Sequence, residues 1–103
     1  MMKLVWSRPA LEDLQAIVDY ISRDSQSYAD DVAARIIHAV ERLMEFPWSG
    51  RSVPEARRRT IREVLVSSYR AVYRVKGAEI QVLAILHAAQ DPRRMRPRPW
   101  TRG

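Results

Sequence analysis

The stretch Ile61-Arg-Glu-Val-Leu-Val-Ser-Ser-Tyr-Arg-Ala-Val-Tyr-Arg-Val-Lys-Gly-Ala-Glu-Ile-Gln-Val-Leu-Ala-Ile-Leu-His87 decides the fold. It holds three segments rich in β-branched, aromatic and aliphatic residues, separated by two short turn signals. This pattern predicts three sequential antiparallel strands. The second turn suits a two-residue type II′ hairpin, because Gly77 can take the positive φ that its first central position requires.

Alternation along these segments predicts how they are buried. The middle strand carries its basic residues on one face and its aromatic and small apolar residues on the other, namely Arg70, Arg74 and Lys76 against Tyr69, Ala71, Tyr73 and Val75. One face is therefore expected to be core and the other a basic, partly wet surface. Residues 80–86 form an almost continuous aliphatic run, as in a central strand covered on both faces.

The chain before this stretch supplies cover for the sheet. Residues 3–6 form a short apolar strand placed to join it, and Ser7 with Pro9 is a typical helix start. Apolar residues then recur at spacings of three and four, at Leu11, Leu14, Ile17, Val18 and Ile21, and at Val32, Ala33, Ile36, Ile37, Val40, Leu43 and Met44. These stripes predict two helices, the first ending near Asp24 and the second capped by Ser27.

The expected fold is α+β. A short N-terminal strand and an antiparallel helix hairpin precede a three-stranded antiparallel meander, and all strands form one sheet packed on the helices. We assign residues 1–91 to a single domain and residues 92–103 to a basic tail rich in proline and arginine. Two interpretations of that tail remain open: it is extended and mobile, or Trp100 folds back as an apolar plug.

Composition narrows the class of protein. The chain has no cysteine, which excludes disulfides and thiolate metal sites. No apolar run approaches the roughly 20 residues that span a bilayer, and residues 1–5 are too short for the core of a signal peptide. We therefore expect a cytoplasmic protein that does not enter a membrane.

The charge is divided unevenly along the chain. Residues 1–50 carry a net charge of −3 and residues 51–103 a net charge of +9. A run of three arginines, Arg57–Arg59, closes a long loop in the basic half. This polarity indicates a basic surface for nucleic acid or for an acidic protein, or else charge that only keeps the protein soluble.

Chemistry-bearing motifs are sparse. The sequence has no phosphate-binding glycine loop, metal-ligand cluster or nucleophile motif, so neither a cofactor nor a metal is predicted. What remains on the strands is a polar set, Arg62, Arg70, Arg74 and His87, with Glu63 and Tyr69 or Tyr73 as proton carriers. Such groups can cleave RNA without a metal, since a base activates the 2′-hydroxyl and arginine stabilises the phosphate. Adjacent Arg62 and Glu63 must point to opposite faces, which weakens this prediction.

Several motifs stand in a characteristic order. They are Trp6 with Ala10-x-x-Asp13-Leu14-x-x-Ile17-x-x-Tyr20-Ile21, then Pro47-x-x-Gly50-Arg51, Ile61-Arg62-Glu63, Tyr69-Arg70-x-Val72-Tyr73-Arg74-Val75, Val82-Leu83-x-Ile85-Leu86-His87 and Asp91. Together they resemble the RelE/ParE superfamily of type II toxin–antitoxin toxins, and the ParE branch more than the RelE branch. The resemblance implies a small toxin neutralised by a cognate antitoxin protein, whose C-terminal segment wraps the toxin in a hetero-oligomer.

The two branches of that superfamily imply different functions. ParE-like members are associated with poisoning DNA gyrase, and RelE-like members cut mRNA on the ribosome. The ribonucleases rely on arginine or lysine with a tyrosine, histidine or glutamate near the end of the last strand. Here only His87 holds such a place, and Ala88 follows it where a tyrosine would be expected.

We therefore expect a non-enzymatic growth inhibitor that acts on DNA gyrase. Its partner-binding residues would be Arg62, Tyr69, Arg70, Tyr73, Arg74 and His87. The alternative is a metal-independent, ribosome-dependent mRNA endoribonuclease with Arg62, Arg70, Arg74 and His87 as catalytic residues. A plain basic binding domain without toxicity is a third interpretation.

Overall fold

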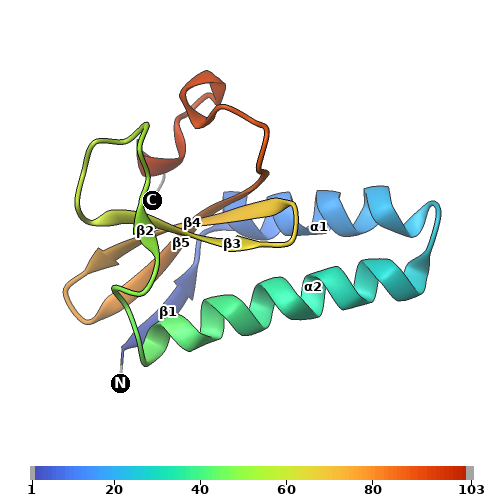
Figure 1. Cartoon of the computed structure of the whole chain (residues 1–103), viewed down its shortest axis with the longest axis horizontal. Helices are drawn as coiled ribbons and strands as arrows, with labels where there is room; N and C mark the ends of the chain where they lie inside the picture. The colour runs from blue at the N-terminus through green and yellow to red at the C-terminus, as the bar shows by residue number, and fades with distance from the viewer. Residues whose placement is uncertain (1, 102–103) are drawn as a thin grey trace.

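The computed structural model describes residues 2–101, in which two helices lie on one face of a five-stranded sheet (Figure 1). The elements are β1 (Lys3–Trp6), α1 (Arg8–Ser22), α2 (Gln26–Glu41), the short 3-10 helix η1 (Arg42–Met44), β2 (Arg51–Ser52), β3 (Ile61–Val66), β4 (Tyr69–Lys76), β5 (Glu79–His87), and the 3-10 helices η2 (Pro92–Arg94) and η3 (Pro99–Thr101). The predicted α+β class is confirmed. Arg102 and Gly103, the end of the predicted tail, lie outside the described residues.

The sheet has the strand order β1-β5-β4-β3-β2. Its last three long strands form the predicted antiparallel meander, while β1 runs parallel to β5, with Lys3 opposite Glu79. Gly77 has a φ of +57° and stands first in the β4–β5 turn, as the hairpin requires. One strand was missed, because Arg51 and Ser52 pair with β3 inside the segment predicted to be a loop. A two-residue strand is too short to show alternation.

Serine side chains cap both helices. The Ser7 hydroxyl accepts a hydrogen bond from the Ala10 amide at 3.2 Å, as predicted for the start of α1. The start predicted for α2 was wrong, because Ser25 is the cap and its hydroxyl accepts from the Tyr28 amide at 3.1 Å. Ser27 lies inside the helix. Capping two residues earlier adds about half a turn of hydrogen-bonded helix.

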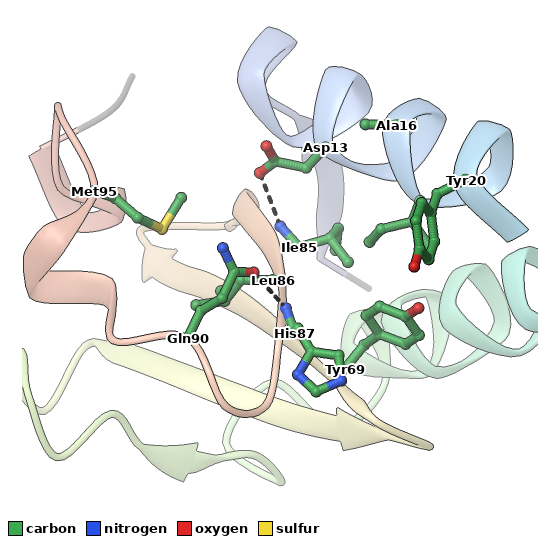
Figure 2. A pocket seen from close by; sticks show the side chains of 10 residues that line it. Asp13, Ala16, Tyr20, Tyr69, Ile85, Leu86, His87, Gln90 and Met95 are labelled. Carbon is green, nitrogen blue, oxygen red and sulfur yellow. Dashed lines mark hydrogen bonds between the residues drawn. The ribbon is translucent and has the colours of Figure 1, made fainter.

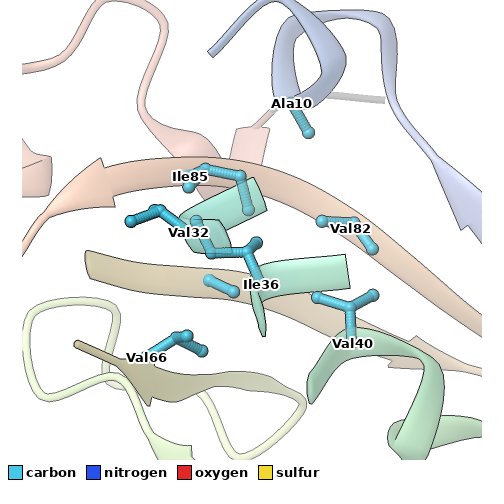
Figure 3. Close-up of a cluster of buried hydrophobic side chains, with 8 residues drawn as sticks. Ala10, Val32, Ile36, Val40, Val66, Val82 and Ile85 are labelled. Atoms are coloured by element: carbon cyan, nitrogen blue, oxygen red, sulfur yellow. The ribbon is translucent and has the colours of Figure 1, made fainter. Parts of the chain in front are cut away.

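A core between the helices and the sheet confirms the predicted helical stripes (Figure 3). It is built from buried residues of both layers: Ala10, Val32, Ile36 and Val40 from the helices, and Val66, Ala71, Val82 and Ile85 from the sheet. Leu14, Ile17 and Ile21 pack at its edge. Leu11 and Ile37, which were counted in the stripes of α1 and α2, are instead exposed. Within the described residues, no helix is long and apolar enough to cross a membrane.

A second core covers the opposite face of the sheet. Val53, Ile61, Val72, Leu83, Ala84, Leu86 and Trp100 form this tail-side cluster. Trp100 is only 7% exposed, so the apolar-plug interpretation of the tail is confirmed and the mobile one is wrong for this residue. Residues 80–86 are therefore covered on both faces, as their aliphatic run predicted.

Candidate functional site

The structure separates the six sequence-predicted site residues into three places. Tyr69 and His87 stand opposite each other at one end of the β4–β5 pair, and Arg62 and Tyr73 stand opposite each other near the far end of β3. Arg70 and Arg74 lie on the other face of β4, under the loop and the tail. Only Tyr69 and His87 meet at an exposed groove.

Arg70 is the centre of a buried ion-pair network. Its Nε donates to Glu63 Oε1 at 2.5 Å, and its Nη2 donates to Glu55 Oε1 at 2.9 Å. Glu63 also accepts from Arg51 Nε at 2.6 Å. The hydrogen bond from Arg70 holds the pKa of Glu55 below its usual 4.5. Because Arg70 is only 5% exposed, the expectation of an open basic face is wrong at this residue.

Burial of that network has an identifiable cause. Arg70 lies opposite Leu65 of β3, and Glu63 lies one pair further along the same face. Two segments distant in sequence then close over them, since Glu55 comes from the β2–β3 loop and the Gln90 carbonyl accepts from Arg70 Nη1. A charge out of contact with water must be paired, and each group here has a partner. The Arg70 guanidinium therefore has a structural role.

Arg74 is half-buried on the same face of β4. Its Nε donates to Gln81 Oε1 at 2.9 Å, and its Nη1 approaches the Trp100 carbonyl oxygen at 3.4 Å. The tail therefore covers part of the surface that alternation assigned to solvent. Periodicity within a strand predicts which residues share a face, but it cannot predict what packs on that face.

Tyr73 and Arg62 hold the loop that follows η1. The Tyr73 hydroxyl donates to the Pro47 carbonyl at 2.8 Å and accepts from the Gly50 amide at 3.0 Å. Burial of the ring raises the pKa of Tyr73. Arg62 Nε donates to the Gly50 carbonyl at 2.8 Å, and its guanidinium carbon lies 5.3 Å from the Trp48 ring centroid.

Gly50 explains why this loop has the spacing Pro47-x-x-Gly50-Arg51. A Cβ at Gly50 would lie 2.5 Å from the Tyr73 Oη and 2.6 Å from the Glu63 carbonyl oxygen. Only a residue without a side chain allows the backbone to approach Tyr73 so closely. Tyr73 is fully buried, so its predicted role as a surface contact is wrong.

A groove beside α1 contains the remaining pair (Figure 2). It encloses about 590 Å³ and is lined by Asp13, Ala16, Ile17, Tyr20, Tyr69, Ile85, Leu86, His87, Gln90 and Met95. The rings of Tyr69 and His87 meet edge to face, with centroids 5.7 Å apart. The Ala89 amide donates to His87 Nδ1 at 3.1 Å, so Nε2 carries the proton in the neutral ring. We refer to this as the α1 groove.

Sequence reasoning missed the contributions of α1 and the tail to this groove. Asp13 is not one of the residues of the predicted apolar stripe, yet its Oδ2 accepts from the Ile85 amide at 3.1 Å. Because β1 ends opposite Val82, the Ile85 amide lies beyond the β1–β5 pairing, and a helix side chain satisfies it. Tyr20, which is 70% exposed, is not part of that stripe either. An aromatic residue on the polar face of the predicted helix is the sequence signal that could have indicated this groove.

A second groove runs along α2. It encloses about 600 Å³ between the helix and the end of β3, and is lined by Asp31, Ala34, Arg35, His38, Ala39, Arg42, Leu65, Val66 and Ser67. His38 is exposed there. No group of three or more His, Cys, Asp or Glu side chains among residues 2–101 is placed to hold a metal ion.

Comparison with known proteins identifies the family. Residues 4–92 match the family model described as the ParE toxin of the type II toxin–antitoxin system parDE. The chain belongs to the ParE toxin family. The match confirms the predicted resemblance, and it ends at Pro92, before the arginine-rich part of the tail.

This ParE-family chain is similar to a named toxin and to a solved toxin–antitoxin structure. Toxin RelE2 of Caulobacter vibrioides is 37% identical over 91 residues, which span 87% of this chain and 99% of the relative. A solved structure described as the chromosomal ParDE system from P. aeruginosa has a TM-score of 0.71 and 32% identity. That comparison covers 84% of this chain and 96% of the other. The protein is thus a type II toxin with the α+β fold of its family.

Proposed function

We propose that this ParE-family toxin inhibits growth by binding DNA gyrase rather than by cutting RNA. The observation that carries the proposal is the separation of the residues a ribonuclease would use. Arg62 stands opposite Tyr73, and His87 stands opposite Tyr69. Tyr73 and Tyr69 are four residues apart on β4, which corresponds to about 13 Å along a strand.

That spacing is too great for one reacting phosphate. A general acid or base must come within hydrogen-bond distance of the proton it transfers, and a stabilising cation must reach the same phosphate. Arg62 is directed to the Gly50 loop, and Arg70 is enclosed by Glu55 and Glu63 on the other face. These contacts support a toxin that acts by protein contact.

Purified toxin with gyrase and relaxed plasmid tests the proposal. We expect loss of supercoiling and accumulation of cleaved DNA when toxin is added, with no cuts in mRNA translated in a reconstituted system. His87→Ala should leave gyrase inhibition within about twofold, since no proton transfer is asked of the imidazole. In a nuclease, loss of the general acid or base would lower the rate by roughly 10²- to 10⁴-fold.

Ribosome-dependent cleavage remains the second candidate, because one 37%-identical relative is named Toxin RelE2. Cuts in mRNA that appear only with ribosomes, and that vanish in His87→Ala, would replace the gyrase proposal with this one.

The proposed partner that silences the toxin is a cognate antitoxin, bound as a hetero-oligomer. We place its apolar side chains in the α1 groove, where Tyr20, Tyr69 and Met95 offer unburied apolar surface. Since Arg70 is buried, the antitoxin would not reach it directly. A segment that folds on binding would bury this surface with its apolar face.

Two exposed tyrosines test the antitoxin proposal as a matched pair. Tyr20 lines the α1 groove, whereas Tyr28, which is 51% exposed on α2, does not. Tyr20→Ala should raise the Kd for antitoxin by about tenfold or more, as for a central aromatic contact. Tyr28→Ala should leave the Kd unchanged. Equal effects of the two substitutions would place the antitoxin on another surface.

A further inference from the structure

We infer that the loop and the tail together form a binding face for the phosphodiester backbone of nucleic acid. The face consists of residues 53–60 and 88–101, and we call it the loop–tail face. This inference goes beyond the proposed action on gyrase and does not depend on it.

Two basic segments, far apart in sequence, meet on this face. Ala56, next to the three arginines of the β2–β3 loop, packs against the tail-side cluster. Met95, between Arg94 and Arg96, packs against the same cluster. Figure 1 accordingly shows the β2–β3 loop and the tail on one side of the sheet, away from α2. The family match stops at Pro92, so residues 93–101, most of the tail's share of this face, lie beyond the matched residues.

The charge of the loop–tail face is strongly positive. Its exposed arginines are Arg57, Arg58, Arg59, Arg93, Arg94, Arg96 and Arg98. The face has two carboxylates, and each is already paired, Glu55 with Arg70 and Asp91 with Arg93. Within residues 2–101, Arg57, Arg58 and Arg98 have no carboxylate at ion-pair distance. These guanidinium groups therefore have donors available for an external anion.

The helical layer on the other side of the sheet has the opposite sign. α1 and α2 carry six carboxylates, from Glu12, Asp13, Asp19, Asp30, Asp31 and Glu41, against Arg8 and Arg35. The charge division along the sequence thus becomes a division between two faces. Such a field orients the molecule so that the loop–tail face meets a polyanion first.

The chemistry of the face favours phosphates over an acidic protein. All seven cations are arginines, whose planar guanidinium binds phosphate through two parallel hydrogen bonds. Arg59 is held with its guanidinium carbon 5.2 Å from the Trp48 ring centroid, which fixes its position before binding. An acidic peptide would need an apolar anchor as well. The α1 groove shares only Gln90 and Met95 with the loop–tail face, and the α2 groove shares no residue with it.

Direct binding measurements with full-length protein test the inference. The probes are fluorescein-labelled 20-base-pair duplex DNA, single-stranded DNA and RNA of the same length, and poly-glutamate, each titrated at several salt concentrations. Three triple variants remove the same formal charge: Arg57→Gln/Arg58→Gln/Arg59→Gln in the loop, Arg94→Gln/Arg96→Gln/Arg98→Gln in the tail, and Arg8→Gln/Arg23→Gln/Arg35→Gln in the helical layer as control. All nine side chains are exposed, so each variant should fold.

We expect the loop and tail variants each to weaken nucleic-acid binding by about 10- to 100-fold at 0.1 M salt, because every lost phosphate contact reduces counterion release. For duplex DNA, the slope of log K against log salt should become less steep by about 2 to 3 units in each. The helical-layer variant should bind like the wild type. The three nucleic-acid probes distinguish duplex DNA, single-stranded DNA and RNA as the source of the phosphate.

Three results would overturn the inference. The first is an equal loss in all three variants, which would make net charge the only cause. The second is poly-glutamate binding as tight as that of nucleic acid, which would make the face a site for acidic protein. The third is no measurable binding of any nucleic acid at 0.05 M salt.

Discussion

Replacing Arg70 by alanine should lower the free energy of unfolding without altering an exposed functional surface. The substitution leaves the buried Glu63 and the partly buried Glu55 without their shared cation. Breaking a buried ion pair by removing one partner costs about 3 to 5 kcal/mol. Glu63 keeps its contact with Arg51 at 2.6 Å, so we expect the lower end, about 3 kcal/mol.

That loss is large for a chain of this size. Domains of about 100 residues have a free energy of unfolding of roughly 5 to 15 kcal/mol. A loss of 3 kcal/mol should lower the Tm by about 12 to 24 °C. The matched control is Arg74→Ala, on the same face of β4. Because Arg74 is only half-buried, its loss should cost less than the loss of the enclosed Arg70.

The pH dependence of the Arg70→Ala variant provides a second readout. In the folded wild type, Arg70 lowers the pKa of Glu55 below 4.5. This carboxylate therefore contributes stability above pH 4.5 that is lost as the pH falls through the lowered value. Arg70→Ala removes that contribution, so the difference in Tm between wild type and variant should narrow between pH 5 and pH 3.

Circular dichroism melts at both pH values measure these effects, and gyrase inhibition at 20 °C measures function. A variant that melts like the wild type would refute the assigned structural role. So would a variant that folds at 20 °C but no longer inhibits gyrase, since Arg70 would then contact the target.

Three further substitutions test the packing. Ile36→Asp places a carboxylate in the helix–sheet core and should abolish the cooperative thermal transition, because the unpaired charge costs several kcal/mol; an unchanged melt would contradict the core assignment. Gly50→Ala should lower the free energy of unfolding by about 1 to 3 kcal/mol, because the added methyl group would clash with Tyr73. Gly77→Ala has open space around it and should cost only about 1 kcal/mol, because of the positive φ at that position. Urea titrations that show a larger loss for Gly77→Ala than for Gly50→Ala would refute this reasoning. Trp100→Ala should lower the free energy of unfolding by about 3 kcal/mol, and a change below 0.5 kcal/mol would mean that the tail does not pack in solution.

Much of the fold follows from local patterns. The alternation in residues 69–76 predicted the two faces of β4, and the spacing of Leu14, Ile17 and Ile21 predicted the buried side of α1. Gly77 and Ser7 have the local geometry expected of them, because turns and caps depend on neighbouring residues. The order of motifs then predicted the family.

The candidate site was less predictable, because long-range contacts decide it. Arg70 looked exposed from its strand, but Glu55, 15 residues before it, and Gln90, 20 residues after it, close over it. Trp100 does not belong to a periodic apolar pattern, so the sequence does not predict that it packs in one cluster with Val72 and Leu83. Asp13 accepts a hydrogen bond from the Ile85 amide, 72 residues further along the chain. Helical periodicity cannot predict such a long-range contact.

The parallel pairing of β1 with β5 also sets the order in which the protein can be completed. Lys3 leaves the ribosome early, but its partner Glu79 is synthesised 76 residues later, which at roughly 5 to 20 residues per second takes about 4 to 15 s. Until then the helix hairpin has emerged without the strand that anchors its start, and its apolar stripe lacks most of its cover. Closure of the sheet thus awaits β5, so a translation product that ends before Glu79 cannot form the β1–β5 pairing.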